Sequence, residues 1–322
     1  MRMRRLAAAL LLLPPLAASD WLRISSSLDA MGTTFTIVAY GVDRARLESA
    51  TDEAFEEVRR LDSLLSNYKK DSEWSRVNRE AASRPVPVSE ELFRLLAACI
   101  DYSRRSGGAF DITVAPLVKT WGFYKGYGRL PHRAEIRDAL AKVGYEGLIL
   151  DPVSRTVRFA KPGMEIDPGG IGKGYAVDRV VAILKAAGVE SALISAGGSS
   201  IYALGGPPDQ PGWKVKIRHP KSPGRTIEET ILRNESMSTS GSYEKFFVAG
   251  GKRYTHIFDP RTGYPATAAV SVSVIAPRTI DSEAWTKPFF IRGREWTARH
   301  KPEGFRVYFC EEKMEVACAW LQ

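Results

Sequence analysis

Residues 166–178, which read IDPGGIGKGYAVD, decide the fold. Four glycines surround Lys173, and an aspartate lies near each end of the stretch. Apolar residues at positions 176–184 then recur every three to four residues, which predicts a helix that ends at Gly188. Glycines let backbone N–H groups approach a ligand, and a helix N-terminus carries partial positive charge. The stretch therefore predicts either a site for an anionic group or a plain tight turn from strand to helix.

The spacing of these glycines excludes two familiar phosphate loops. A P-loop requires a serine or threonine directly after the lysine, whereas Gly174 follows Lys173. The dinucleotide fingerprint G-x-G-x-x-G also fails, because Gly170, Gly172 and Gly174 are evenly spaced. A phosphate-binding turn of another kind is the remaining functional interpretation.

The composition is that of an ordinary globular protein, with 44% hydrophobic and 26% charged residues among 322. The formal charge of +9 includes three arginines in the first five residues. The remaining positive surplus is compatible with an anionic substrate. No run of lysines and arginines interleaved with aromatic residues occurs, so we do not expect a nucleic-acid partner.

Residues 1–19 resemble a secretory signal peptide. They combine a basic start, an apolar stretch at 6–16 and small residues just before Asp20. The apolar stretch is too short to span a bilayer, although an uncleaved membrane anchor remains an alternative. We expect export to the periplasm and one mature domain over residues 20–322, with membrane association only if the signal is retained.

The three cysteines are expected to have different roles. Cys99 lies on an apolar helical face and is expected in the core. Cys310 and Cys318 flank a predicted hairpin turn and could pair in an exported protein. No cysteine–histidine cluster has the spacing of a zinc site.

The pattern along the chain predicts the α+β class, with mixed or antiparallel sheets and helices packed on them. Long amphipathic helices are expected at 47–65 and from the N-cap Ser89 to about residue 105, and a further helix near residue 281. Residues 71–78 are expected to form a polar loop or short helix. Alternation and β-branched residues predict strands at 34–40, 148–150, 156–159, 191–195, 213–218, 226–232, 253–258, 270–275 and around Cys310.

Two segments carry candidate reactive groups. His256 is one of four histidines and is expected in a strand, three residues before Asp259 of the turn at 259–263. Either side chain could accept a proton from a hydroxyl, although a histidine in a strand is usually structural. In the helix near residue 281, Glu283 and Thr286 could offer oxygens to a hard cation. The spacing by itself favours a surface ion pair between Glu283 and Lys287.

Several motifs in the same order resemble the ApbE family, the FAD:protein FMN transferases of bacterial flavinylation. They cover residues 28–293 without large gaps. The matching motifs are Met31-Gly32-Thr33, 65–68 with 72–78, 108–116 with Trp121-Gly122-Phe123, 167–178, 195–198, 239–243 and 256–263.

The resemblance implies a single T-fold-like α+β domain that binds FAD. The family cleaves the FAD pyrophosphate with Mg²⁺ and joins FMN to a threonine or serine hydroxyl of an acceptor, typically an electron-transfer protein, releasing AMP. By matched position, His256 would lie near the scissile phosphates and Gly170 would offer a main-chain carbonyl to the metal. The residues implied to line the FAD site are Met31, Tyr68, Ala109, Phe110, Asp111, Asp167, Lys173 and Ile257.

Two departures from the family pattern affect the expected metal site. The family's metal helix carries an aspartate and a threonine four residues apart, and the gapless match here gives Glu283 and Lys287. A lysine ammonium has no lone pair to donate to a metal. Thr286 or Asp281 could replace the missing ligand, or Lys287 could partly substitute for the charge of the cation. The second departure is Ser199-Ser200, where the family often has an acidic residue or asparagine.

These departures leave two alternatives to an active transferase. One is a non-catalytic FAD-binding protein, and the other is an FAD pyrophosphatase that releases free FMN and AMP.

Overall fold

The main layer of the computed structural model is an eight-stranded sheet in which every neighbouring pair is antiparallel. The structure describes residues 21–222, 224–312 and 314–322. The predicted signal peptide lies outside these residues. In spatial order, the strands are β1 (Leu22–Ala30), β2 (Thr33–Gly41), β6 (Ser191–Ala196), β7 (Ser200–Leu204), β10 (Glu235–Gly241), β13 (Ser271–Ala276), β14 (Arg306–Glu312) and β15 (Val316–Leu321).

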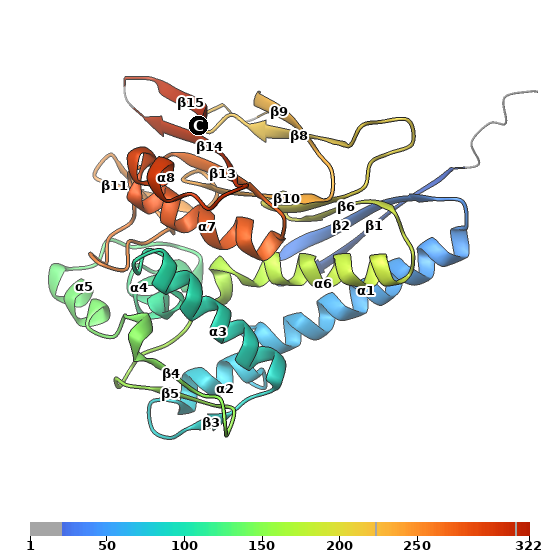
Figure 1. The fold of residues 1–322 in the computed structure, drawn as a ribbon. Coiled ribbons are helices and arrows are strands. Elements are labelled where there is room, and N and C mark those ends of the chain that lie inside the picture. The colour runs from blue at the N-terminus through green and yellow to red at the C-terminus, as the bar shows by residue number, and fades with distance from the viewer. Residues whose placement is uncertain (1–20, 223, 313) are drawn as a thin grey trace, which may run out of the picture.

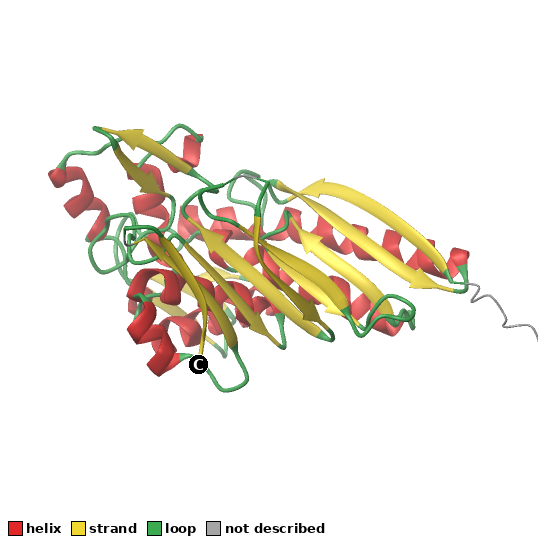
Figure 2. Cartoon of the chain, turned by 90° about the horizontal axis from the view of Figure 1, so that it is seen from above, coloured by secondary structure: helices red, strands yellow, loops and turns green. Residues whose placement is uncertain are grey.

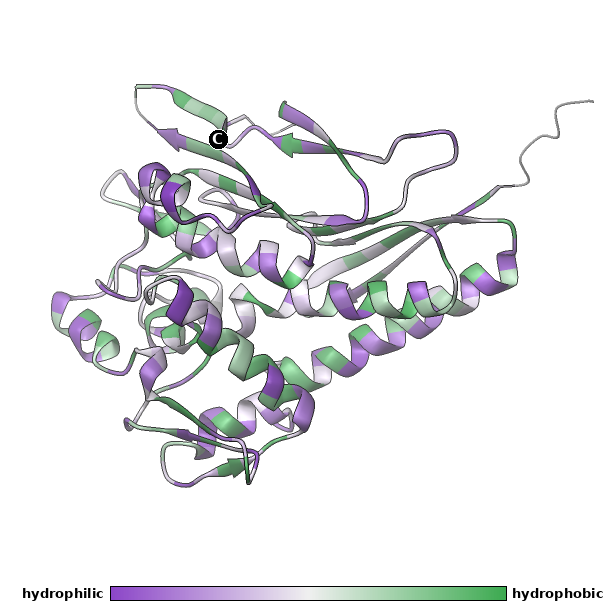
Figure 3. Ribbon diagram, in the orientation of Figure 1, coloured by the Kyte–Doolittle hydropathy of each residue, from purple (hydrophilic) through white to green (hydrophobic). Residues whose placement is uncertain are grey.

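Three long helices cover one face of this sheet (Figures 1 and 2). They are α1 (Arg44–Leu65), α6 (Gly172–Ala186) and α7 (Thr279–Arg292). Helix α6 packs between the other two, and α7 also contacts β10 and β13. The hairpin of β8 (Trp213–Arg218) and β9 (Thr226–Leu232) packs on the opposite face. Figure 3 shows hydrophobic and hydrophilic residues alternating along α1, as expected for a helix that buries one face.

A second group of elements packs beneath the helices in the view of Figure 1. A small sheet has the spatial order β3 (Val86–Pro87), β5 (Thr156–Phe159) and β4 (Leu148–Asp151). The hairpin of β11 (Phe246–Ala249) and β12 (Lys252–Thr255) is separate from this sheet. The remaining elements are α2 (Glu73–Glu80), α3 (Glu90–Arg105), α4 (Ala115–Thr120), α5 (Arg133–Leu140), α8 (Arg294–His300) and four short 3₁₀ turns. None of the described helices is both long and apolar enough to cross a membrane.

The glycine-rich stretch largely follows the prediction. The apolar positions of α6 are buried, and Gly188 has φ +70 beyond the end of the helix. However, the helix begins at Gly172 rather than after the stretch, so Lys173 and Gly174 lie in its first turn. Pro168–Gly170 forms a 3₁₀ turn just before it. The stretch therefore brings the start of a helix, rather than a free loop, to the site.

Three strands of the main sheet, β1, β7 and β10, were not expected. Strand β7 pairs back onto β6 through the turn at Gly197 and Gly198, both of which have positive φ. Strand β10 is rich in serine, which hides its character in the sequence. Two of these serines, Ser236 and Ser238, are buried and hydrogen-bond to Ser282 of α7. Buried polar pairing thus replaces the apolar alternation that would have revealed the strand.

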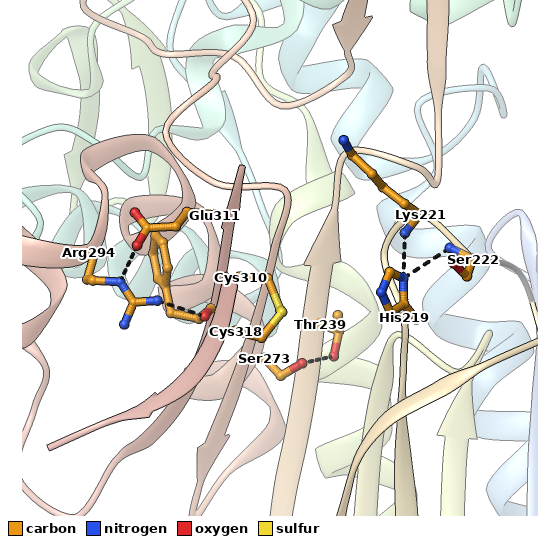
Figure 4. The surroundings of a disulfide bond; sticks show 10 residues. His219, Lys221, Ser222, Thr239, Ser273, Arg294, Cys310, Glu311 and Cys318 are labelled. Carbon is orange, nitrogen blue, oxygen red and sulfur yellow. Dashed lines mark hydrogen bonds and ion pairs between the residues drawn. A yellow bond between two sulfur atoms is a disulfide. The ribbon is translucent and has the colours of Figure 1, made fainter. Parts of the chain in front are cut away.

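The cysteine predictions agree with the structure. Cys310 and Cys318 are directly opposed across β14 and β15 and form a disulfide (Figure 4). Arg294 lies beside it, where it donates to Glu311 and to a main-chain carbonyl of β14. Cys99 is fully buried in α3, as expected for a core residue.

Candidate active site

The first turn of α6 lies directly against α7. The Gly174 N–H donates to Glu283 Oε2, and the carboxylate of Asp178 accepts from the N–H groups of Thr279 and Ile280 at 2.7 and 2.9 Å. A Cβ on Gly174 would lie 2.6 Å from the Thr279 carbonyl oxygen. Glycine is therefore required here by the close approach of two helices.

Lys173 extends from the same turn toward the β6–β7 connection. Its Nζ donates to Ser199 Oγ, so the β6–β7 connection, which contains Gly197 and Gly198, lies beside the first turn of α6. Gly170 lies close by: a Cβ on it would be 3.4 Å from the Phe110 ring and 3.5 Å from Lys287 Cε. The structure thus brings Gly170, Lys173, Phe110 and Lys287 into one neighbourhood.

Glu283 and Lys287 form a buried pair, so the expectation of a surface ion pair was wrong. Lys287 Nζ lies 3.0 Å from the main-chain oxygen of Glu283 and 3.9 Å from its Oε1. The Glu283 side chain is 3% exposed and that of Lys287 is 20% exposed. The pKa of Lys287 is lowered to about 8, mainly by burial; the charge of Glu283 opposes this shift and the charge of Lys173 adds to it.

The two candidate replacement ligands on α7 are engaged elsewhere. The hydroxyl of Thr286 is fully buried, accepts from Ser240 of β10 at 2.8 Å and donates to the Glu283 carbonyl at 2.7 Å. Asp281 accepts from Tyr102 at 2.5 Å and forms an ion pair with Arg278.

In the proposed ligand set of Gly170, Glu283 and Thr286, the hydroxyl of Thr286 is therefore held by other partners, and the metal role of the set stays a prediction. Thr286 precedes Lys287 by one residue, and this step of about 100° turns its hydroxyl toward the sheet. Across the described part of the chain, no group of three or more histidine, cysteine, aspartate or glutamate side chains could hold a metal ion. The side chains of α7 do not fit a magnesium site, because the Lys287 ammonium lies 3.9 Å from Glu283 Oε1, the oxygen that the Gly174 N–H leaves free.

His256 lies in a bend just after β12, not within the strand as predicted. Its ring Nδ1 is 3.0 Å from the carbonyl oxygen of Lys245. Because a carbonyl can only accept, Nδ1 carries the proton and Nε2 retains its lone pair. Burial lowers the pKa of His256 to about 4, and the charges of Lys245, Lys287 and Lys173 act in the same direction. We call these four residues the lysine–histidine cluster.

Asp259 has a different environment. Its Oδ1 accepts from the main-chain N–H and Nε of Arg261 at 3.0 and 2.8 Å, and its Oδ2 accepts from Nη2 at 2.7 Å. Its main-chain oxygen accepts from Gly263 and closes the turn. Both carboxylate oxygens are thus occupied within the turn, which gives Asp259 a structural role. Its catalytic role stays a prediction that this geometry does not favour.

Tyr68 is another residue that the family resemblance implies in the FAD site. It is 73% exposed, and its ring stacks on that of Tyr124 with the two ring centres 5.0 Å apart. Asn67 links it to Asp167, whose carboxylate accepts from the Asn67 amide at 2.9 Å and from the Gly169 N–H at 2.8 Å. Burial raises the pKa of Asp167, and the nearby charge of Lys245 opposes that shift. The surface therefore continues from an exposed aromatic pair to the lysine–histidine cluster.

Asp111 stabilises a loop rather than presenting free oxygens. Its Oδ1 accepts from the N–H and hydroxyl of Thr113, both at 2.7 Å, and its Oδ2 accepts from the Tyr145 N–H at 2.9 Å. Burial raises its pKa to about 6. The other implied contacts, Ala109, Phe110 and Ile257, are also buried. Any hydrogen bond from Asp111 to a ring or ribose would have to share oxygens that already have partners.

Met31 occupies a tight turn between β1 and β2 with φ +53. Its N–H donates to Asp62 of α1 at 3.0 Å, and its methyl group lies beside Gly172. It is therefore placed at the start of α6, next to the glycine-rich stretch.

Sequence reasoning missed two residues of this surface, Lys245 and Tyr124. Lys245 lies in the turn before β11, and Tyr124 follows the Trp121-Gly122-Phe123 motif. No motif includes either residue. The one signal for Lys245 was its place two residues after the motif at 239–243.

Comparison with known proteins places this chain in a family. The chain is 31% identical over 298 residues to a protein of Klebsiella pneumoniae named FAD:protein FMN transferase, covering 90% of this chain and 85% of the relative. The ApbE protein of Thermotoga maritima superposes with a TM-score of 0.83 at 30% identity, covering 89% and 94%. The flavinyl transferase ApbE of Pseudomonas stutzeri gives 0.83 at 30% identity, covering 94% and 95%.

These matches confirm the predicted α+β architecture with antiparallel sheets and packed helices. The sequence pattern of the ApbE family extends over residues 31–309, and the chain therefore belongs to the ApbE family.

Proposed function

We propose that this protein is an FAD:protein FMN transferase, which cleaves FAD and attaches FMN through a phosphoester to a threonine or serine of an acceptor protein. The observation that carries the proposal is the lysine–histidine cluster beside the start of α6, where the charges of three lysines act on an imidazole whose Nδ1 is held by the Lys245 carbonyl. Relatives of this chain bear the same name. An FAD pyrophosphate is the kind of anion that such a cluster would bind.

The transfer requires mainly positioning and charge neutralisation. Lys173 and Lys287 would contact the phosphate oxygens, together with the positive end of α6. The acceptor hydroxyl oxygen would attack the FMN phosphorus, forming one P–O bond as the bond to the AMP phosphate breaks. His256 Nε2 would accept the hydroxyl proton, because Nδ1 is held by the Lys245 carbonyl. AMP is the leaving group.

The low pKa of free His256 does not oppose this role. Bound pyrophosphate would bring negative charge among the lysines and thereby raise the pKa of the imidazole from its value in the free protein. The acceptor type and the phosphoester link are inferred from the family resemblance. Dependence on Mg²⁺, also implied by the resemblance, is not supported by the oxygen donors present, and no step above requires a metal.

We also propose that the protein acts after export, in the periplasm. The signal-like residues 1–19 support this, and so does the Cys310–Cys318 disulfide, because structural disulfides persist mainly in oxidising compartments. Membrane association would follow only if the signal is retained.

The test is incubation of the chain lacking residues 1–19 with FAD and a protein that carries a Thr/Ser flavinylation motif, both with and without added Mg²⁺. We expect the acceptor to gain the mass of FMN minus water, with an equal amount of AMP released. Bound FAD with neither product would indicate a non-catalytic FAD-binding protein. AMP and free FMN without a labelled acceptor would indicate a pyrophosphatase.

A further inference from the structure

Lys287 lies where the family resemblance places a metal ligand, yet its side chain is a cation. Glu283 and Lys287 are one helical turn apart on α7 and face the start of α6. The ammonium lies 3.0 Å from the Glu283 carbonyl oxygen and 3.9 Å from Oε1, and the side-chain stem adjoins Gly170. These neighbours are the carboxylate and the glycine that were expected to surround the cation.

The charge of Glu283 is already balanced in this arrangement. One carboxylate oxygen accepts the Gly174 N–H, and the other faces the ammonium. A divalent ion at this point would have to displace a lysine whose side chain is only 20% exposed. It would also experience repulsion from Lys173, which is close enough to lower the pKa of Lys287.

The other two candidate side-chain ligands on α7 are not free to complete a metal site. The buried hydroxyl of Thr286 accepts a hydrogen bond from Ser240 and donates one to the Glu283 carbonyl. Asp281 forms an ion pair with Arg278. A hard cation such as Mg²⁺ needs several oxygen ligands, whereas Lys287 offers only donors. An ammonium can nevertheless neutralise phosphate oxygens and donate hydrogen bonds to them.

We propose that the Lys287 ammonium replaces the divalent cation in this protein, so that it binds the FAD pyrophosphate without a metal ion. The inference rests on the proposed function for the identity of the ligand. It assigns Lys287 a direct contact with the phosphates and Glu283 the task of holding the ammonium in place.

The first experiment measures FAD affinity by flavin fluorescence after EDTA treatment and dialysis, in the presence and absence of added Mg²⁺. We expect the two dissociation constants to agree within about twofold, which is the precision of such a titration. A dissociation constant at least tenfold weaker without metal, and recovered by Mg²⁺, would overturn the proposal. Metal analysis of the dialysed protein verifies that no tightly bound ion remains.

Two substitutions separate charge from metal binding. Lys287→Thr supplies the family's hydroxyl, and we expect its FAD affinity in EDTA to fall at least tenfold and to recover with Mg²⁺. Lys287→Arg keeps the charge and should bind FAD in EDTA better than Lys287→Thr. Lys214→Met is the matched control, because this lysine is exposed on β8, and its FAD affinity should not change. Circular dichroism verifies that every variant is folded.

The inference fails if Lys287→Thr binds FAD in EDTA as tightly as the parent protein. The proposed function fails separately, if FAD is bound but neither AMP nor a labelled acceptor forms with or without Mg²⁺. The affinity measurements still decide the role of Lys287 in that case, because they do not depend on turnover.

Discussion

Gly174→Ala tests whether the contact between α6 and α7 determines the geometry of the site. The new methyl group would lie 2.6 Å from the Thr279 carbonyl oxygen and 2.8 Å from Glu283 Oε2. Ordinary contacts to such a carbon begin at 3.4 Å, so the helices would have to separate by roughly 0.8 Å, the difference between 3.4 and 2.6 Å. Neither backbone can give way locally, because both belong to regular helices.

Three terms set the magnitude. Overpacking a close contact costs about 1–3 kcal/mol. Stretching the charged hydrogen bond from Gly174 to Glu283 removes part of about 1.5–3 kcal/mol. The higher helix propensity of alanine offsets these losses by about 1 kcal/mol. We therefore expect a net loss of about 2–3 kcal/mol in the free energy of unfolding, which for a chain of this length corresponds to a melting temperature lower by roughly 3–5 °C.

Gly172→Ala is the matched control, because it lies in the same turn of the same helix. Its methyl group would meet the flexible end of Met31 at 3.3 Å and Pro168 Cβ at 3.6 Å, an ordinary contact distance. We expect its unfolding free energy to stay within about 1 kcal/mol of the parent value. Urea unfolding of both variants, followed by circular dichroism, measures the difference. Equal stability of the two variants would refute the argument from the close approach of the helices.

Three further predictions concern the reactive groups, the disulfide and a buried carboxylate. His256→Gln should lower kcat for AMP release by a factor of roughly 10²–10⁴ and leave FAD binding largely intact, whereas Asp259→Asn should mainly lower the melting temperature. A large loss of kcat in Asp259→Asn, together with normal kcat in His256→Gln, would contradict the assignment of His256 as the base. Reducing Cys310–Cys318, which are separated by 8 residues, should cost about 2.5 kcal/mol of unfolding free energy by loop-closure entropy, and unchanged urea midpoints with dithiothreitol would refute this. Hydrogen bonds from two arginines lower the pKa of Glu57 to about 2 in the folded protein. The ionised carboxylate therefore stabilises the fold fully above its unfolded pKa of about 4.5, and this contribution to the unfolding free energy is lost as the pH falls toward 2. Near pH 7 we expect Glu57→Gln to be less stable than the parent protein by about 1 kcal/mol, a small difference because both arginines are half-exposed. Urea unfolding at a series of pH values should show this difference shrink as the pH falls from about 4.5 toward 2.

Local pattern was sufficient for much of the fold. The apolar periodicity of α1, α3 and α6, the N-cap Ser89 and the helix end at Gly188 are all as expected, because each depends on neighbours within a few residues. Strand β10 was not recognised, because its buried serines are satisfied by hydrogen bonds to α7. Their partners are more than 40 residues away in the sequence.

The sequence by itself determined the family, the glycine-rich helix start and the identities of Lys173, His256 and Glu283 as candidate site residues, since motifs and their order are properties of the chain. Only the tertiary structure decided which groups face one another. It turned Thr286 toward β10, paired Asp259 with Arg261 and placed the Lys287 ammonium against Glu283. The reason is that spacing along a helix gives a direction, whereas charge balance and burial depend on segments far apart in the sequence.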